Sequence, residues 1–261
     1  MSLLQVESLG IDFGGLRAVN DVSFSVKAGE IVSVIGPNGA GKTTLFNMIS
    51  GVYLPGRGRI SLAGEEVTGL GPHLLAERGL SRTFQNPQIF QTMTVLENVT
   101  VGHHLHELGS VLADLLALPA SRRRSRTSEA GAYKLLERVG LAQAAERTAG
   151  SLSYGALKRL EIARALALQP RVLLLDEPAA GCNAVETAEI DHLIAEIAAA
   201  GVSILLVEHD MKMVMRISNH IVVLDHGEKI AEGEPSTVAR NPRVVEAYLG
   251  AQGVEAANVD C

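Results

Sequence analysis

A glycine-rich stretch at positions 36–44, GPNGAGKTT, most constrains the fold of this chain. It fits the pattern G-x-x-x-x-G-K-[ST], and we call it the phosphate loop. The short apolar run 31–35 directly precedes it and predicts a buried strand, while Leu45, Met48 and Ile49 follow at helical spacing. The motif therefore has the strand, loop and helix context that it requires. It predicts an α/β fold in which phosphate groups bind between the strand and the helix.

The residue types of the phosphate loop suit a nucleoside triphosphate with Mg²⁺. Glycines let backbone N–H groups converge on phosphate oxygens, and the N-terminus of the following helix adds positive potential. Lys42 is suited to neutralise the β- and γ-phosphates, and the Thr43 hydroxyl is a candidate Mg²⁺ ligand. The alternative is a glycine-rich turn with one surface lysine. The candidate nucleotide-binding residues here are Gly36, Asn38, Gly39, Ala40, Gly41, Lys42, Thr43 and Thr44.

Two neighbouring carboxylates, Asp176 and Glu177, directly follow the apolar run 172–175. In open α/β sheets, ligands bind at the carboxyl ends of the strands, where these residues are expected to lie. Asp176 is a candidate Mg²⁺ ligand, and Glu177 is a candidate base that orients and deprotonates the attacking water. The alternative is an acidic turn that ends a strand, which the phosphate loop in the same chain disfavours.

Short runs rich in β-branched residues and leucine predict further buried strands. The runs are 31–35, 172–175, 203–207 and 221–224. Between the second and the third, apolar residues at i, i+3, i+4 and i+7 from Ile190 predict one helix face, and Gly201 follows as a helix stop. Because parallel strands need helical crossovers, we expect an α/β core with a mostly parallel sheet.

Two regions depart from this strand and helix alternation. The N-terminal residues and the glycine-punctuated stretch 56–64 predict an antiparallel β side layer. From 86 to 151, leucines recur at helical spacing, which predicts an inserted α-helical subdomain. We expect a single domain over 1–261, in which 1–85 and 152–250 form the nucleotide-binding core with its β side layer, 86–151 the helical subdomain and 251–261 a loose tail.

Composition excludes several other classes of protein. The chain has 261 residues, of which 47% are hydrophobic and 20% charged, as is typical of globular proteins rather than disordered chains. A net charge of -6 has the wrong sign for general nucleic-acid binding. Two cysteines, Cys182 and Cys261, are too few for a disulfide framework and indicate a reducing compartment. No apolar stretch approaches the roughly 20 residues of a membrane span, and no signal peptide is recognisable.

Four further motifs follow in a fixed order. Gln85 lies in the sequence TFQ, residues 152–156 read LSYGA before a helical stretch, residues 180–183 read AGCN, and His209 lies in VEHD. Their order and spacing resemble the Q-loop, signature, D-loop and switch histidine of ATP-binding cassette (ABC) ATPases. The resemblance covers about residues 3–250 and implies a P-loop NTPase (RecA-like) core.

Within that family, the chain most resembles the ATPase subunits of branched-chain amino acid importers, whose signature reads LSYG. The supporting segments are FGGLRAV at 13–19, RTFQN at 82–86, MTVLENV at 93–99 and LEIARAL at 160–166. The resemblance implies that two such subunits meet head to tail, with each ATP between the phosphate loop of one and the signature of the other. Ser153 and Gly155 would then contact the γ-phosphate. The alternative for Ser153 is a plain helix N-cap.

The family resemblance implies roles for three more residues. Phe13 matches the aromatic residue that stacks on adenine, unless it is an ordinary core residue. Gln85 would complete the shell of Mg²⁺ or water, and His209 would bond to the γ-phosphate and position Glu177, unless it is a structural histidine. The candidate catalytic residues are thus Glu177, His209, Lys42 and Gln85, and the candidate Mg²⁺ ligands are Thr43, Gln85 and Asp176.

The resemblance also implies partners. These are a second ABC ATPase subunit, homologous or identical, transmembrane permease subunits and, indirectly, a substrate-binding protein, with the chain peripheral on the cytoplasmic face of the inner membrane. No nucleic acid is expected. The rival interpretation is a soluble ABC ATPase with a mechanical or regulatory role, but mechanical members carry a long coiled coil or two ATPase halves, and this chain shows one motif set.

Some residues depart from the family pattern or carry competing signals. Ala156 stands where the subfamily usually has Gln, and Cys182 and Ala184 replace Leu and Pro in the D-loop, which bears on the level of activity. Clustered histidines at 103, 104 and 106 are expected to be helix-surface residues rather than metal ligands. The arginine run 122–126 is expected to be a solvated face, with contact to anionic lipid or a partner as the alternative.

Overall fold

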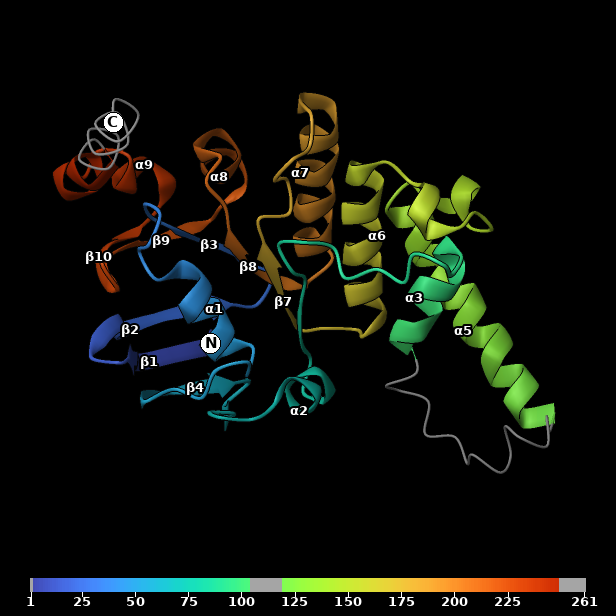
Figure 1. Ribbon diagram of the computed structural model, residues 1–261, viewed down its shortest axis with the longest axis horizontal. Helices are drawn as coiled ribbons and strands as arrows, with labels where there is room; N and C mark the ends of the chain where they lie inside the picture. The colour runs from blue at the N-terminus through green and yellow to red at the C-terminus, as the bar shows by residue number, and fades with distance from the viewer. Residues whose placement is uncertain (1, 104–118, 249–261) are drawn as a thin grey trace.

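The structure is a computed structural model that describes residues 2–103 and 119–248, and the side chains of 119–126 also lie outside the description. Two β-sheets and the helices around them form the molecule (Figure 1). The expected tail 251–261, His104, His106 and Cys261 lie outside the described residues, as do the side chains of the arginine run 122–126. In the described part, no helix is both long and apolar enough to cross a membrane.

The larger sheet has six strands in the order β10-β9-β3-β8-β7-β6. The strands are β3 (Ile31–Ile35), β6 (Leu80–Arg82), β7 (Val172–Asp176), β8 (Ser203–Val207), β9 (His220–Asp225) and β10 (Glu228–Gly233). All neighbours are parallel except β10, which pairs antiparallel with β9. The mostly parallel α/β core and all four predicted strands are confirmed. Sequence patterns missed β6, which is only three residues long, and β10, which carries three charged residues and has no buried residue.

The smaller sheet is antiparallel, in the order β2-β1-β4-β5. It contains β1 (Ser2–Phe13), β2 (Leu16–Lys27), β4 (Arg57–Leu62) and β5 (Glu65–Glu66). Gly14 and Gly15 connect β1 to β2 with positive φ angles of 53° and 88°, a conformation that glycine adopts without steric cost. The predicted antiparallel side layer is therefore confirmed, and the β1–β2 connection carries Phe13 at its edge.

Helix α1 (Lys42–Ile49) lies between the two sheets (Figure 1). Its buried residues Leu45, Phe46, Met48 and Ile49 join one hydrophobic core with side chains of β1, β2 and β4 and with Val32 and Val34 of β3. Successive residues of a strand point to opposite faces of the sheet, so alternate residues of β7 divide between this core and another one. The burial of α1 fixes the phosphate loop that precedes it.

A second hydrophobic core covers the opposite face of the six-stranded sheet. It joins Leu173 and Leu175 of β7 to α6 (Tyr154–Ala167) and α7 (Ala184–Ala199). The apolar face predicted from Ile190 onward is buried in α7, and Gly201 follows that helix with a positive φ of 96°. The other α-helices in the described residues are α2 (Pro72–Glu77), α3 (Val95–His103), α5 (Pro119–Arg138), α8 (Met211–Ile217) and α9 (Pro235–Val238).

Helices α3 and α5 pack beside α6 at one end of the molecule (Figure 1). Val95 and Val99 of α3 and Ala132 and Leu136 of α5 share the core of α6 and α7. Among the described residues of 86–151, the secondary structure consists of these helices, two short 3₁₀ turns and a single isolated bridge between Thr94 and Thr148. This part of the chain therefore packs on the sheet through α6.

Candidate nucleotide-binding and hydrolysis site

The phosphate loop joins the end of β3 to the start of α1, and its glycines fit where other residues would not. Gly36 has a φ of 153°, and a Cβ there would lie 2.1 Å from the backbone oxygen of Leu224. Gly41 has a φ of 97°, and a Cβ there would lie 2.6 Å from the backbone oxygen of Ala18. No side chain caps the N-terminus of α1. Its first N–H groups and positive dipole end are therefore suited to an anion.

Lys42 is buried at the start of α1. Its ammonium donates hydrogen bonds to the backbone oxygens of Gly36 at 2.6 Å and Pro37 at 3.0 Å. Burial lowers the pKa of Lys42, while the negative charges of Glu177 and Asp176 act in the opposite direction. The lysine amine is thus held in the loop and lies in the field of both predicted carboxylates.

The phosphate loop lines a cavity of about 530 Å³. Its lining residues are Phe13, Leu16, Arg17, Ala18, Asn38, Gly39, Ala40, Gly41, Lys42, Thr43, Thr44, Glu177 and His226. The cavity therefore brings seven of the predicted phosphate-loop contacts together with Glu177, which is distant in sequence. Arg17 and His226 were not singled out by sequence patterns.

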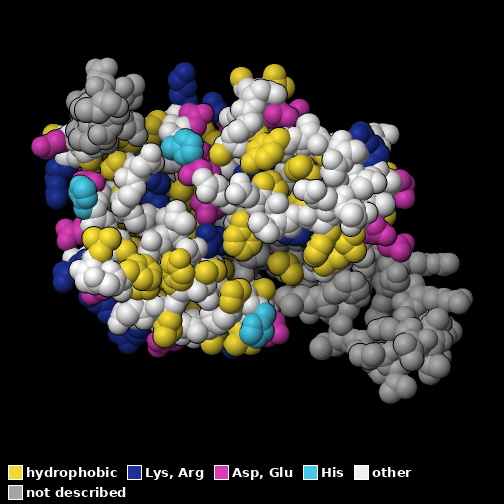
Figure 2. Space-filling view, in the orientation of Figure 1, with side chains coloured by type: hydrophobic (Ala, Val, Ile, Leu, Met, Phe, Trp, Pro, Cys, Tyr) yellow, Lys and Arg dark blue, Asp and Glu magenta, His cyan; other side chains and the backbone are white. Residues whose placement is uncertain are grey.

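Phe13 lies at the edge of this cavity and is 45% exposed, so it is not a core residue. Its ring packs edge-on against Tyr53, with ring centroids 5.5 Å apart and an interplanar angle of 72°. Hydrophobic side chains gather over the antiparallel sheet and α1 in the view of Figure 2. The exposed large hydrophobic residues from this part of the chain are Phe13, Leu16, Val52, Tyr53 and Leu54. A flat apolar ring is thus available beside the phosphate loop.

Two predicted residues, Gln85 and His209, meet at Glu177. The amide nitrogen of Gln85 donates to one Glu177 carboxylate oxygen at 2.8 Å, and His209 Nδ1 lies 3.4 Å from the other. Glu177 has a positive φ of 48° directly after β7, and its N–H donates to the backbone oxygen of Val207 at 2.9 Å. His209 is 62% exposed at its side chain. The carboxylate is therefore oriented by two side chains that come from separate segments of the chain.

Asp176, the predicted Mg²⁺ ligand, is paired with Arg82 in the structure. Their side chains are 7% and 6% exposed, and Arg82 Nη2 donates to Asp176 Oδ2 at 2.8 Å. Arg82 also donates to Asn47 Oδ1 at 2.7 Å and to Ser50 Oγ at 2.8 Å. Sequence patterns did not single out Arg82. The pair ties the end of β6 to the end of β7 and to α1.

Replacing Arg82 by Met is expected to destabilise the fold by about 3–5 kcal/mol, because the variant leaves the buried Asp176 carboxylate without its partner. Urea unfolding followed by circular dichroism measures this loss. The control is Arg17→Met, which removes an exposed ion pair with Asp12 at 3.8 Å and is expected to cost at most about 1 kcal/mol. Equal stability losses in the two variants would contradict this account of the buried pair.

Ser153 is the N-cap of α6, which was the alternative to a contact with the γ-phosphate. Its hydroxyl accepts from the N–H of Ala156 at 3.3 Å and donates to Glu186 Oε1 at 3.3 Å. Gly155 lies so close to Glu186 that a Cβ would be 2.4 Å from its carboxyl carbon. Of the described residues, neither Ser153 nor Gly155 is among those that line the phosphate-loop cavity. A contact of these residues with nucleotide would therefore involve another subunit.

Three buried charged residues near the site were missed by sequence patterns: Lys158, Glu161 and Glu208. Glu208 follows β8, and its carboxylate accepts from the N–H groups of Ala179 at 3.0 Å and His209 at 3.1 Å. Burial raises the pKa of Glu208 and of Glu161. One sequence signal could have revealed Lys158 and Glu161. They are two charged residues, one helical turn apart, on the otherwise apolar buried face of α6.

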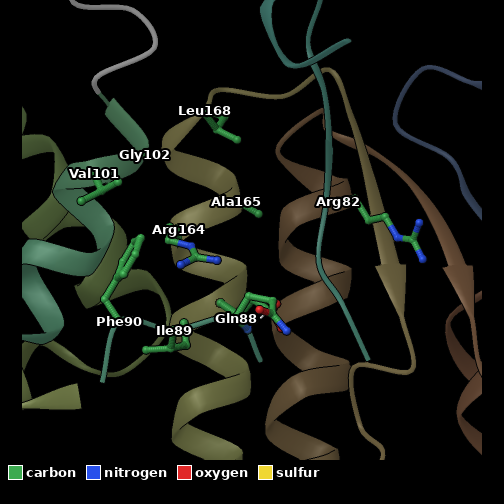
Figure 3. A pocket seen from close by; sticks show the side chains of 10 residues that line it. Arg82, Gln88, Ile89, Phe90, Val101, Gly102, Arg164, Ala165 and Leu168 are labelled. Atoms are coloured by element: carbon green, nitrogen blue, oxygen red, sulfur yellow. Dashed lines mark hydrogen bonds between the residues drawn. The ribbon is translucent and has the colours of Figure 1, made fainter. Parts of the chain in front are cut away.

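A second cavity, of about 490 Å³, lies where the chain after Gln85 passes between α3 and α6. Figure 3 shows its residues, with Ile89 and Phe90 beside α6 and the guanidinium of Arg164 pointing toward Phe90. Arg164 Cζ lies 5.6 Å from the centre of that ring, a cation–π contact. Asn98 of α3 bonds to both the N–H and the carbonyl of Phe90 at 3.0 Å. This cavity is therefore connected by a few residues of chain to Gln85.

Comparison with known proteins agrees with this site. The family model described as ABC transporter matches residues 19–180, which include the phosphate loop, Gln85, Ser153 and Glu177. The chain belongs to the ABC transporter family. It has the P-loop NTPase α/β fold of that family's ATP-binding cassettes, which bind and hydrolyse ATP. A second model, described as branched-chain amino acid ATP-binding cassette transporter, matches residues 228–254.

Curated relatives and a solved structure resemble this cassette along nearly its whole length. It is 49% identical to the high-affinity branched-chain amino acid transport ATP-binding protein BraF of Pseudomonas aeruginosa, over 95% of this chain and 98% of the relative. It is 47% identical to LivG of Escherichia coli K12, of the same description, with the same coverage. The ADP conformation of MJ1267, an ATP-binding cassette of an ABC transporter, superposes with a TM-score of 0.84 at 36% identity, over 96% of this chain and 99% of that one.

Proposed function

We propose that this chain is the ATP-hydrolysing subunit of a branched-chain amino acid importer. The observation that carries the hydrolytic role is the meeting of Gln85 and His209 at the Glu177 carboxylate, on the border of the phosphate-loop cavity. The cargo class rests on the similarity to BraF and LivG and on the family model over 228–254.

In this proposal, the residues of the cavity divide the work of binding ATP. The ring of Phe13 packs on adenine, and the N–H groups at the start of α1 bind the phosphates. Lys42 exchanges its bonds to the loop carbonyls for bonds to the β- and γ-phosphates, which are charge-assisted and stronger. Tight binding of the phosphates then rests on groups that the loop already orients.

For hydrolysis, Glu177 accepts a proton from the attacking water, and Gln85 and His209 hold its carboxylate in position. Thr43, Gln85 and Asp176 offer side-chain oxygens, the ligands that Mg²⁺ prefers. The oxygen of Gln85 is available because the bond to Glu177 uses its amide nitrogen. When bound, Mg²⁺ supplies positive charge that offsets the negative charge of the phosphates. The ion pair with Arg82 holds the Asp176 side chain at the end of β7.

A second ATPase subunit, homologous or identical, completes the site. Ser153, Gly155 and the N-terminus of α6 offer a hydroxyl, a close backbone approach and a positive dipole end to a phosphate, yet none of the three lies in this chain's own cavity. A heteromeric pair is expected in the cell. Copurification of the intact transporter measures this, and a transporter with a single type of ATPase chain would contradict it.

The second cavity is the proposed contact with the permease, which also holds the chain at the cytoplasmic face of the membrane. Its apolar residues Ile89 and Phe90 follow Gln85 in the chain, so a change at Glu177 can be passed along the segment to a partner. Helices α3 and α5, which pack beside α6, are proposed to shift with it. A substrate-binding protein would deliver the amino acid on the other side of the permease.

Replacing Phe90 by Ala is expected to weaken binding to the permease subunits by about 30-fold, the effect of removing a central aromatic residue worth about 2 kcal/mol. ATP hydrolysis by the isolated chain should not change, because the bonds of Asn98 hold the main chain of Phe90. Binding is measured by titrating the purified permease in nanodiscs. The control is Tyr133→Ala, another exposed aromatic residue, on α5, and equal losses in the two variants would contradict the proposed contact.

The proposed cargo is tested by uptake in cells that lack the gene for this chain. Cells that carry the wild-type gene should take up radiolabelled leucine, isoleucine and valine, and cells that carry Glu177→Gln should not. Uptake of labelled urea serves as the comparison for another cargo class. If the Glu177→Gln cells lose urea uptake but still take up leucine, isoleucine and valine, the branched-chain assignment is contradicted and the ATPase role is not.

A further inference from the structure

Lys158 is the most deeply buried lysine near the hydrolysis site, and both of its hydrogen bonds are made to residues of that site. It belongs to α6, the helix that begins after Ser153, and it is 2% exposed. Its ammonium donates to the backbone oxygen of Gln85 at 2.6 Å and to the backbone oxygen of Glu177 at 3.2 Å. One side chain therefore joins the main chains of two residues whose side chains also meet.

Glu161, one turn further along α6, bonds to the segment 84–88, which contains Gln85. It is 3% exposed, and its Oε1 accepts from the N–H of Phe84 at 3.1 Å and the N–H of Gln88 at 3.4 Å. Lys158 and Glu161 thus bond to the main chain on both sides of the Gln85 side chain. Residues three apart on a helix lie on the same face, so α6 holds the segment 84–88 with two opposite charges.

The bond from Lys158 to Glu177 also acts on a strained part of the backbone. Glu177 has a φ of 48°, a conformation that costs free energy in any residue except glycine and persists only where the surroundings hold it. Its N–H donates to Val207, and its carbonyl oxygen accepts from Lys158 and from the N–H of Ala180, both at 3.2 Å. The direction of the Glu177 carboxylate therefore depends on a lysine of the signature helix.

We propose that Lys158 is a positioning residue for ATP hydrolysis. It keeps the Gln85 and Glu177 side chains in contact with each other and connects both residues to α6. The inference rests on the proposed function of Glu177. Because Ser153 caps the N-terminus of α6, a phosphate bound at Ser153 by one subunit acts through Lys158 on that subunit's own Gln85 and Glu177. The two ATP sites of a dimer are thereby coupled within each chain.

The test is the variant Lys158→Met, which keeps the length of the side chain and removes its charge. We expect kcat for MgATP to fall by about 100-fold, the effect of misplacing a catalytic group by about 1 Å, with KM within twofold of wild type because the phosphate loop is untouched. Lys212→Met, which alters an exposed lysine of α8, is the control and should retain the wild-type kcat. An unchanged kcat in Lys158→Met overturns the inference.

A double-mutant cycle with Gln85→Ala separates positioning from a structural role. If Lys158 acts through Gln85, Lys158→Met lowers kcat much less in the Gln85→Ala background than in the wild type. Equal losses in both backgrounds overturn the inference. If the wild-type chain hydrolyses no ATP, or if Glu177→Gln retains wild-type turnover, the proposed function itself fails and the inference with it.

Hydrogen exchange gives a readout that does not depend on turnover. In Lys158→Met without nucleotide, the amides of 84–88 should exchange at least tenfold faster than in the wild type, while those of β3 should not change. A second variant, Glu161→Gln, keeps the shape of the side chain and weakens the bonds to Phe84 and Gln88, so it should accelerate the same amides. Unchanged exchange of 84–88 in both variants overturns the inference.

Discussion

Replacing Glu177 by Gln is expected to lower kcat for ATP hydrolysis by about 1,000-fold, because a positioned general base contributes about 10²–10⁴-fold. Gln has the same shape and keeps an oxygen that accepts the hydrogen bond from Gln85, so the cluster with His209 should persist. Nucleotide affinity should be unchanged or higher, since the phosphate loop and Lys42 are intact. Steady-state phosphate release and binding of a fluorescent ATP analogue measure the two quantities.

The matched control is Glu66→Gln, which makes the same chemical change at an exposed residue of β5. Its kcat should equal that of the wild type. With ATP and Mg²⁺, Glu177→Gln should also form a long-lived dimer, visible by light scattering, because nucleotide is bound and not consumed. A Glu177→Gln chain that turns over within threefold of the wild type would show that another group acts as the base.

Replacing Lys42 by Ala is expected to weaken binding of MgATP by about 10- to 150-fold. The variant removes one charge-assisted interaction with the phosphates, worth about 1.5–3 kcal/mol. In the chain without nucleotide, the same change takes away the donor that bonds to the backbone oxygens of Gly36 and Pro37. Calorimetric titration of each variant with ATP and Mg²⁺ measures the affinity.

The control for Lys42→Ala is Lys27→Ala, which changes an exposed lysine at the end of β2. Its affinity for MgATP should equal that of the wild type. Hydrolysis by Lys42→Ala should fall together with binding, since the same ammonium serves the bound substrate and the charge that develops during phosphoryl transfer. Wild-type affinity in Lys42→Ala would contradict the assignment of the phosphate site to this loop.

Local patterns were sufficient for the parts of the fold that are locally determined. The four strands found from apolar runs are buried on both faces, and continuous apolar runs of that length are characteristic of such strands. The phosphate loop could be predicted from its own glycines. Two of them have a positive φ and lie so close to backbone oxygens that a side chain would not fit. The resemblance to ABC ATPases also implied that His209 lies beside Glu177, as it does, whereas the hydrogen bond from Gln85 to Glu177 was not predicted.

Contacts between distant segments were beyond local patterns. Arg82 and Asp176 are 94 positions apart, and only the parallel pairing of β6 with β7 brings their strands together. Lys158 likewise reaches a backbone oxygen 73 positions away. A charge within an otherwise apolar helix face signals such a partner, but it does not say which one. The partner of a buried charge follows from the topology of the sheet rather than from the neighbouring sequence.

The most direct test of the central claim is amino acid transport by the reconstituted importer. Proteoliposomes that contain this chain, its partner ATPase and the permease subunits are supplied with substrate-binding protein, labelled leucine and ATP with Mg²⁺ on the appropriate sides. We expect leucine accumulation that depends on ATP and stops with Glu177→Gln in both ATPase chains. ATP hydrolysis at a normal rate without any accumulation of leucine, isoleucine or valine would contradict the account.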